Sequence, residues 1–396
     1  MAAAALGGVS GGAANVLHNL YFVALGFAEA ALPAFSRFGL LGAAGGALVA
    51  GPVVALIGPR RAILVGTVLV AAGTLTLLAV TGMLPIGAGL LAISFGSLVV
   101  YIGAPAFLAA SSSPEERPYL FGVAAAAYVV STALGAAVGG ALPGVVRGLA
   151  PELAPADVYR SALVAAGVLS ALAIPLLALT REEPAGDVVT PGAHFGAVRD
   201  FFTHVRQPGF LKLVTQLVLA DGLIRVGGNL FLPYLNVYFV NHLGASEALY
   251  GLMRSVERGL VVLTTLSVAL LVARFGQIAV IVVTQLLSVP LLLTVGLAPT
   301  LAVAVTAYVL RGPIMEMTQP TRDNFVMDVS PARLRATALA ALTLAGYAIG
   351  FGTSYVSERL FEAGRFRLSF VVAAALYVMS ALLYWWFFRG YNRARG

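Results

Sequence analysis

One long apolar segment carries acidic, basic and amide side chains at helical spacing. Asp221, Arg225 and Asn229 recur at every fourth residue, and Asn236 lies close to the same helix face. An aspartate and an arginine one turn apart can form a structural ion pair. Alternatively, Asp221 binds a proton or a cation, and Arg225 tunes that binding. The sequence leaves both interpretations open.

Two later apolar segments also contain ionisable residues. Arg311 and Glu316 are separated by five residues and need not share a helix face. Arg254, Glu257 and Arg258 follow an i, i+3, i+4 pattern, which favours an ion pair between helices over a substrate contact. Because an ionisable group costs at least about 2.5–3.5 kcal/mol at a bilayer centre, such groups usually face an aqueous cavity.

The first apolar segment carries a polar stripe. At 3.6-residue spacing one face holds Asn15, His18, Asn19, Phe22, Gly26 and Glu29. This stripe predicts either a cavity lining or hydrogen bonds between helices, and Glu29 could lie at the outer end. Tyr101 shares a face of the fourth segment with Ser94 and Ser97, which makes it a weaker candidate for a pocket.

The composition requires a membrane. Hydrophobic residues make up 60% of the 396 residues, charged residues only 10%, and the mean hydropathy is +0.94. Soluble chains carry about 25% charged residues. Since backbone groups in hydrocarbon must pair internally, only helices or a closed barrel can span it. The runs are too long and do not alternate as barrel strands would, so we expect an all-α membrane protein.

Twelve spans are expected in two groups of six. They lie near 13–36, 38–57, 62–82, 84–110, 118–142, 161–180, 210–240, 246–273, 277–297, 299–321, 335–358 and 368–388. The domains are then an N-terminal bundle over 1–180, a polar linker over 181–209 and a C-terminal bundle over 210–396.

The basic residues predict the orientation. If both termini are cytoplasmic, fourteen of the 24 lysines and arginines lie on that side, six lie opposite and four fall inside spans. The net charge of +7 is therefore mostly a topology signal, and we expect no nucleic-acid partner. The start of the sequence does not resemble a secretory signal. The arginine-rich, alanine-rich composition suggests a prokaryotic inner membrane.

Two landmarks indicate an internal repeat. Ser113-Pro114-Glu115-Glu116-Arg117 follows the fourth span, and a similar Ser-Pro run begins at Ser330 after the tenth, 217 residues later. Gly58 follows the second span and Gly276 the eighth, 218 residues later. The agreement within one residue predicts a duplicated six-helix unit.

Several functions lack their sequence signature. The chain has no cysteine, its four histidines are scattered without metal-ligand spacing, and no glycine loop precedes a Lys-Ser/Thr pair. We therefore expect no metal, no cofactor and no enzyme activity, and we expect a monomer in the lipid bilayer with a small-molecule substrate.

The loop after the second span carries a family signature. The run from Gly51 to Arg61, with Gly58, Arg60 and Arg61, resembles the G-x-L-A-D-R-x-G-R-R motif of the major facilitator superfamily. Ala55 and Leu56 replace its Asp and Arg. The resemblance covers the whole chain in outline and implies two six-helix halves latched by this loop on the cytoplasmic side.

The fifth span resembles the glycine motif of drug:proton antiporters. Gly122, Ser131, Gly135, Gly139 and Gly140 follow its spacing, with Ser131 in place of a glycine and Ala136 in place of the proline. Small residues let helices approach closely, which suits a seam between the halves. Ordinary packing in a glycine-rich protein is the alternative. Span 4 lacks the buried arginine that many such antiporters carry near the position of Val99.

These features together predict a secondary transporter that works by alternating access. We expect proton-coupled export of a small amphiphilic solute, with the acids of spans 7 and 10, Asp221 and Glu316, as coupling residues by that resemblance. The alternative is an importer or facilitator of a polar nutrient such as a sugar or an organic anion, with Arg225 and Arg311 as anion contacts. A membrane enzyme or sensor is less consistent with the sequence.

Overall fold

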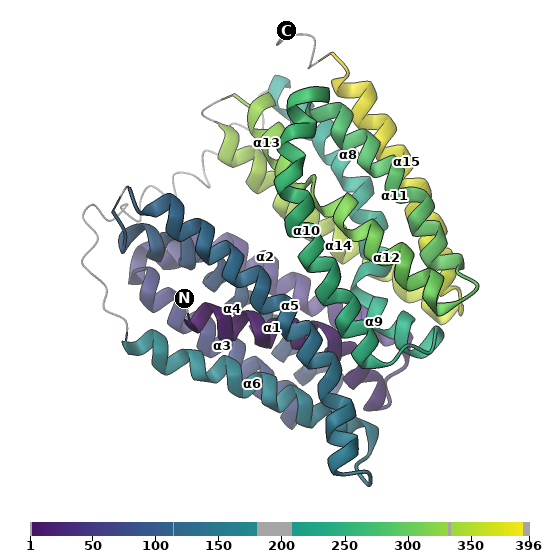
Figure 1. Cartoon of the computed structure of the whole chain (residues 1–396). Helices are drawn as coiled ribbons and strands as arrows, with labels where there is room; N and C mark the ends of the chain where they lie inside the picture. The colour runs from purple at the N-terminus through teal and green to yellow at the C-terminus, as the bar shows by residue number, and fades with distance from the viewer. Residues whose placement is uncertain (1, 114, 180–207, 332–333, 391–396) are drawn as a thin grey trace. The chain divides into compact units, whose positions relative to one another are not determined.

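A computed structural model describes residues 2–113, 115–179, 208–331 and 334–390 (Figure 1). Every regular element in these ranges is a helix, as the composition predicts. The predicted linker lies outside the described residues, apart from its last two positions. By packing, the chain divides into two compact units: an N-terminal unit of Met1–Arg199 with Ser246–Ser255, and a C-terminal unit of Asp200–Ala245 with Val256–Gly396.

The N-terminal unit contains the first six predicted spans. Its helices are α1 (Ala2–Ala24), the short 3₁₀ turn η1 (Glu29–Ala31), α2 (Leu32–Ile57), α3 (Pro59–Ala79), α4 (Met83–Ala110), α5 (Arg117–Leu149) and α6 (Pro155–Leu179).

The last six predicted spans follow the linker in the sequence. Their helices are α8 (Pro208–Phe231), η2 (Leu232–Tyr234), α9 (Leu235–Val237), the π-helical η3 (Tyr238–His242), α10 (Glu247–Phe275), α11 (Gln277–Leu297), α12 (Leu301–Glu316), α13 (Gln319–Val329), α14 (Arg335–Glu362) and α15 (Phe366–Phe388). Apart from the first turns of α10, they belong to the C-terminal unit.

Helix packing confirms the internal repeat. In the N-terminal unit α1 packs on α5 and α6, and α3 packs on α4 and α6. In the C-terminal unit α8 packs on α14 and α15, and α11 packs on α12 and α15. These are the same pairs six spans apart. Gly58 and Gly276 also adopt the same positive φ, +84° and +80°, between the second and third helix of each group.

Within the described ranges, nine helices are long and apolar enough to cross a membrane. Of the helices at the twelve predicted positions, α1, α8 and α12 are outside this set. These are the helices that carry His18, Asp221 and Arg311, and α12 has only 16 residues. Three of the candidate polar residues therefore lie on the helices whose hydropathy or length falls short of a simple span, although α10, among the other nine, also carries Glu257 and Arg258.

Several predicted spans have the wrong bounds. The fifth was expected to end at 142 but α5 continues to Leu149, and the seventh was expected at 210–240 but α8 ends at Phe231. The first was expected at 13–36, but α1 ends at Ala24. Gly26 has a positive φ of +96°, which breaks the helix, and Pro33 lies in the first turn of the next helix, α2. The tenth was expected at 299–321, but α12 ends at Glu316 and α13 begins at Gln319, with Pro320 in its first turn. Sequence periodicity detects neither break.

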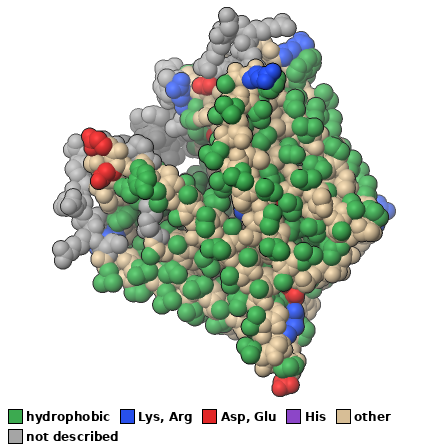
Figure 2. All heavy atoms as spheres, in the orientation of Figure 1, with side chains coloured by type: hydrophobic (Ala, Val, Ile, Leu, Met, Phe, Trp, Pro, Cys, Tyr) green, Lys and Arg blue, Asp and Glu red, His purple; other side chains and the backbone are tan. Residues whose placement is uncertain are grey.

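Exposed apolar side chains are abundant, as a bilayer requires. Figure 2 shows hydrophobic side chains over most of the visible face, with sparse charged ones. On α10, Leu263, Leu266 and Leu270 are 62%, 73% and 75% exposed and recur at helical spacing. The opposite side of this helix carries Glu257, which is buried. The helix thus presents one apolar surface and one polar surface.

Candidate functional site

Asp221 and Arg225 form the predicted ion pair on α8. The Arg225 Nε donates to Asp221 Oδ2, and the guanidinium lies over Gly346 of α14, where a Cβ would come within 2.8 Å of Nη1. Arg322 of α13 joins them, with its Nε 3.9 Å from Asp221 Oδ1. The Asp221 side chain is only 9% exposed. One carboxylate therefore lies between two cations inside the C-terminal unit.

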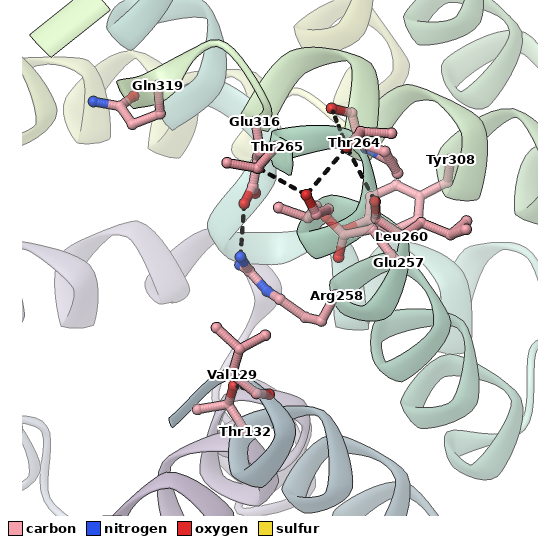
Figure 3. Close-up of polar contacts among 12 residues, drawn as sticks. Val129, Thr132, Glu257, Arg258, Leu260, Thr264, Thr265, Tyr308, Glu316 and Gln319 are labelled. Carbon is pink, nitrogen blue, oxygen red and sulfur yellow. Dashed lines mark hydrogen bonds and ion pairs between the residues drawn. The ribbon is translucent and has the colours of Figure 1, made fainter. Parts of the chain in front are cut away.

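Glu316 and Arg258 bridge α12 and α10 (Figure 3). Arg258 Nη1 donates to Glu316 Oε2 at 2.6 Å, and their side chains are 34% and 41% exposed respectively. This contact confirms the expected ion pair between helices. It also gives Glu316 a partner on another helix, whereas Arg311 on its own helix has a different environment, described below.

Glu257 is a second acidic side chain at the same junction, and it is buried. Tyr308 of α12 donates its hydroxyl to Glu257 Oε2 at 3.4 Å. The carboxylate lies against Gly312, where a Cβ would come within 2.5 Å of Glu257 Oε1. About two turns further along α10, the Thr264 hydroxyl donates to the Pro313 carbonyl oxygen at 3.4 Å. Polar contacts therefore join α10 and α12 over several turns.

Arg311 is fully enclosed in the C-terminal unit, at 3% exposure. Its Nη2 donates to the Tyr377 hydroxyl at 3.0 Å, and its guanidinium lies over the rings of Phe231 and Tyr377. Asn229, also on α8, is partly buried. The structure thus places Asp221, Arg225, Glu316, Arg311 and Asn229 in one unit, but it separates them into distinct clusters.

The candidates of the N-terminal unit are dispersed. His18 is partly buried and stacks on Phe22, with ring centroids 6.1 Å apart, and Asn19 is also partly buried. Glu29 lies in η1, beyond the end of α1, so its predicted place on the same helix face as His18 is wrong. Tyr101 is 72% exposed on α4.

Three of the predicted seam glycines pack inside their own unit. A Cβ on Gly135 would come within 2.1 Å of the Val9 carbonyl oxygen, and one on Gly139 within 2.5 Å of Ala13 Cα. Both contacts are with α1 of the same unit, and the expected place of these glycines between the halves stays a prediction. Gly140 contacts a different helix of the same unit, because a Cβ there would come within 2.4 Å of the Glu247 carbonyl oxygen, in the first turn of α10.

The residues of the signature loop also act within the N-terminal unit. Gly58 supplies the positive φ that separates α2 from α3. Arg60 donates to the Ala178 carbonyl oxygen at 2.6 Å and to that of Leu177 at 3.4 Å, which caps the last turn of α6. Arg61 is exposed. The observed contacts of Arg60 stabilise a helix end of the same unit.

Sequence reasoning missed a second ionic cluster. Arg147, in the last turn of α5, donates to both carboxylate oxygens of Glu247, and Tyr159 of α6 donates to Glu247 Oε1 at 2.7 Å. All three belong to the N-terminal unit. Arg147 was expected in a loop. The available signal was the helical pattern of α5, which continues beyond the predicted end at 142.

Sequence reasoning also missed Arg322, Phe231 and Tyr377. Arg322 lies in α13, a helix with too few apolar residues to be recognised as part of a membrane span. Phe231 and Tyr377 are ordinary aromatic residues in apolar segments, and no sequence signal distinguishes them. Only the fold brings them to Asp221 and Arg311.

The sequence and the fold agree with a single family. A model of the major facilitator superfamily matches residues 1–355, which is most of the chain. The chain belongs to this superfamily. The match confirms the resemblance seen in the loop after the second span and identifies the protein as a transporter rather than an enzyme.

Solved structures of several transporters have the same fold. A D-xylose–proton symporter is similar with a TM-score of 0.74 and 17% identity, covering 97% of this chain and 96% of that one. The nucleoside transporter NupG is similar with a TM-score of 0.75 and 14% identity, covering 97% of this chain and 97% of that one. A bacterial homologue of the human lysosomal transporter Spinster, in an inward-facing occupied conformation, is similar with a TM-score of 0.69 and 17% identity. The match covers 97% of this chain and 94% of that one.

A search of curated protein sequences finds no match. The structural neighbours differ in their solutes, and their low identity shows the shared fold alone. This superfamily member is therefore a multi-pass membrane transporter of a small molecule, and its solute must be inferred from its own residues.

Proposed function

We propose that this transporter exports a small amphiphilic solute in exchange for protons, by alternating access. The observation that carries the coupling part is the ion pair between Arg258 and Glu316 on two helices of the C-terminal unit. A coupling carboxylate must exchange a proton with water and must change partner during the cycle. Glu316 meets both requirements, since it is partly exposed and has one cationic partner on another helix.

Glu257 supports this assignment. Glu257 is buried and directly precedes Arg258, the partner of Glu316, in the sequence. Its carboxylate accepts a hydrogen bond from Tyr308, which lies on the same helix as Glu316. When Glu316 takes a proton, Arg258 loses its counter-charge, and Glu257 is the acidic neighbour on the same helix. Protonation of one acid would thus alter the polar contacts that join α10 and α12.

Asp221 fits a structural role better than a coupling role. Its carboxylate already faces two guanidinium groups and has little access to water. Opposite charges on both sides stabilise the ionised form, which suits a permanent ion-pair network. We therefore assign coupling first to Glu316 and retain Asp221 as a prediction to be tested separately.

The export direction is supported by α5. Gly135, Gly139 and Gly140 all face the backbone of a neighbouring helix so closely that a Cβ would clash. Small residues at the antiporter-like spacing permit such close packing, here with helices of the same unit. The alternative, import or facilitated diffusion of a polar nutrient, makes a different prediction for proton movement and is resolved by the same experiment.

Everted membrane vesicles with an acidic lumen provide the test. Compounds to which the expressed protein gives a sensitive host resistance are added outside, and a pH-sensitive dye follows the gradient. Exchange of protons for solute should discharge the gradient. Glu316→Gln should abolish the discharge, whereas Glu362→Gln, a half-exposed carboxylate of the same unit, should not.

Two results would contradict the proposal. Undiminished discharge by Glu316→Gln would exclude Glu316 as the coupling acid. Solute movement without any proton movement in the unmodified protein would make it a uniporter.

The orientation belongs to the same proposal: both termini and the 181–209 linker are cytoplasmic. The natural chain has no cysteine, so single cysteines at Ala185 and Gly148 can report it. An impermeant thiol reagent added to intact cells should label position 148, where a side chain has open space, but not position 185. The reverse pattern would invert the topology.

A further inference from the structure

Arg311 is a buried cation without an acidic partner. No ion pair forms between Arg311 and a carboxylate in the residues that the structure describes, and its Nε is buried without a hydrogen-bond partner. The other arginines at the centre of the C-terminal unit are paired: Arg225 and Arg322 with Asp221, and Arg258 with Glu316. Arg322 also has guanidinium nitrogens without a hydrogen-bond partner, so Arg311 differs from the other three in lacking a paired carboxylate within the described part of the chain.

An unpaired buried charge is costly unless something neutralises it. Phe231 of α8 and Tyr377 of α15 lie 5.3 and 5.4 Å from the guanidinium carbon, measured to the ring centroids. The two rings offer cation–π attraction, which offsets only part of the desolvation cost. The rings also form apolar walls beside the charge. A positive group between apolar walls is suited to an anion that carries an apolar body.

The helices are shaped to hold Tyr377 in this position. A Cβ on Gly227 would come within 2.8 Å of the Tyr377 ring, and one on Gly228 within 3.4 Å of its hydroxyl. Glycine at 227 therefore lets the ring lie against α8 with its hydroxyl at Arg311, whereas the approach at Gly228 is an ordinary contact. This hydroxyl accepts from Arg311 Nη2 and keeps its own hydrogen to donate. Arg311 Nε and Tyr377 thus provide two free donors.

We propose that Arg311, Tyr377 and Phe231 bind the carboxylate group of the transported solute, whose remaining body is apolar or aromatic. This rests on the proposed transport function and names its substrate class. A single cation favours a monoanion, because a dianionic phosphate would leave an excess negative charge in the membrane. A guanidinium also matches the planar geometry of a carboxylate. The acidic group on the neighbouring helix, Glu257, lies against Gly312 and accepts from Tyr308.

Thermal unfolding of the purified full-length protein in lipid nanodiscs, without any gradient, tests this. Benzoate is compared with benzamide, which has nearly the same shape but no charge, at constant ionic strength and pH. Benzoate should raise the unfolding midpoint in a saturable way, and benzamide should not. Arg311→Gln should weaken benzoate binding roughly 10- to 100-fold, the usual loss when a hydrogen bond to a charged group is removed.

Arg359→Gln serves as the control, because Arg359 is an exposed arginine of the same unit, and its benzoate response should be unchanged. If Arg311→Gln does not fold, Tyr377→Phe removes one donor and should weaken benzoate binding several-fold. Equal stabilisation by benzoate and benzamide, or an undiminished response in the variants, would overturn the proposal. Such a result would leave proton exchange untouched, since the gradient assay is independent of this binding assay.

Discussion

The two units pack equivalent helix pairs by opposite means. In the N-terminal unit α2 meets α4 through glycines, and a Cβ on Gly42 would come within 2.3 Å of the Leu91 carbonyl oxygen. In the C-terminal unit the corresponding pair, α10 and α12, is joined by Arg258, Glu316, Glu257 and Tyr308. One junction is dry backbone packing, and the other is a set of charged and polar contacts.

This contrast separates scaffold from chemistry. Close backbone packing has one stable arrangement, because a packed interface without voids resists sliding. An ion pair between partly exposed side chains can break and reform without a change in helix packing. The duplicated fold therefore uses its second copy to hold titratable groups inside the membrane, whereas its first copy has fewer of them.

Within the C-terminal unit, a second contrast separates the two kinds of ion pair. Asp221 is nearly buried between two arginines, whereas Glu316 and Arg258 are each at least one-third exposed. Breaking a buried pair leaves an uncompensated charge in low dielectric, whereas an exposed group regains water. Mutations of the two carboxylates should consequently differ in stability and in transport.

The largest effect is expected for Asp221→Asn. The loss of the carboxylate leaves Arg322, whose side chain is 12% exposed, without its partner, which costs about 3–5 kcal/mol. Folded yield and the thermal unfolding midpoint should both fall. Arg225→Gln or Arg322→Gln in the same chain should restore part of the loss. Asp157→Asn, which breaks an exposed pair with Arg160, is the matched control and should have little effect.

The opposite outcome for Asp221 is equally informative. Should Asp221→Asn fold normally yet fail to couple transport to the pH gradient, Asp221 would be a coupling acid. The distinction between a structural and a coupling carboxylate in this unit would then be lost.

A smaller but clear effect is expected at the glycine packing of the N-terminal unit. Gly135→Leu forces side-chain atoms into the backbone of α1, so overpacking should cost about 1–3 kcal/mol and lower the folded yield. Gly144→Leu places the same side chain on the same helix in open space and should be tolerated. Normal unfolding midpoints for both variants would contradict the close packing. Normal folding with loss of transport alone would instead support the seam originally expected between the halves.

Much of the fold follows from the sequence, because membrane spans obey simple rules of length and polarity. The approximate places of most spans, the repeat at Gly58 and Gly276, and an ion pair of Asp221 with Arg225 as one of two interpretations were all predictable. The helix break before Glu29 was not, because one glycine with a positive φ overrides an apparently continuous polar stripe.

The candidate site was predictable only in part. Local spacing identifies partners on the same helix, such as Asp221 and Arg225. It does not identify partners on different helices, so the contacts of Arg322 with Asp221 and of Tyr377 with Arg311 require the fold. Gly135 shows the same limit, since a small-residue pattern reveals that a helix approaches closely but not which helix it is.

The smallest effect on stability is expected for Glu316→Gln. Its partner Arg258 is 34% exposed and can be solvated when the pair is lost, so the unfolding free energy should change by about 1 kcal/mol or less. A double-mutant cycle with Arg258→Gln, read by thermal unfolding, would measure this coupling energy directly.

The same variant should nevertheless lose the proton exchange described above, and that combination is what distinguishes a coupling pair from a structural one. A carboxylate that alternates between binding a proton and pairing with an arginine cannot contribute much to the stability of the fold through that pair, because the ion pair breaks in every transport cycle. If Glu316→Gln instead lowers the unfolding midpoint as much as Asp221→Asn does, both carboxylates are structural. The charged junction of α10 and α12 would then be a scaffold like the glycine junction of α2 and α4, and the coupling acid would have to be sought elsewhere, with Glu257 as the next candidate.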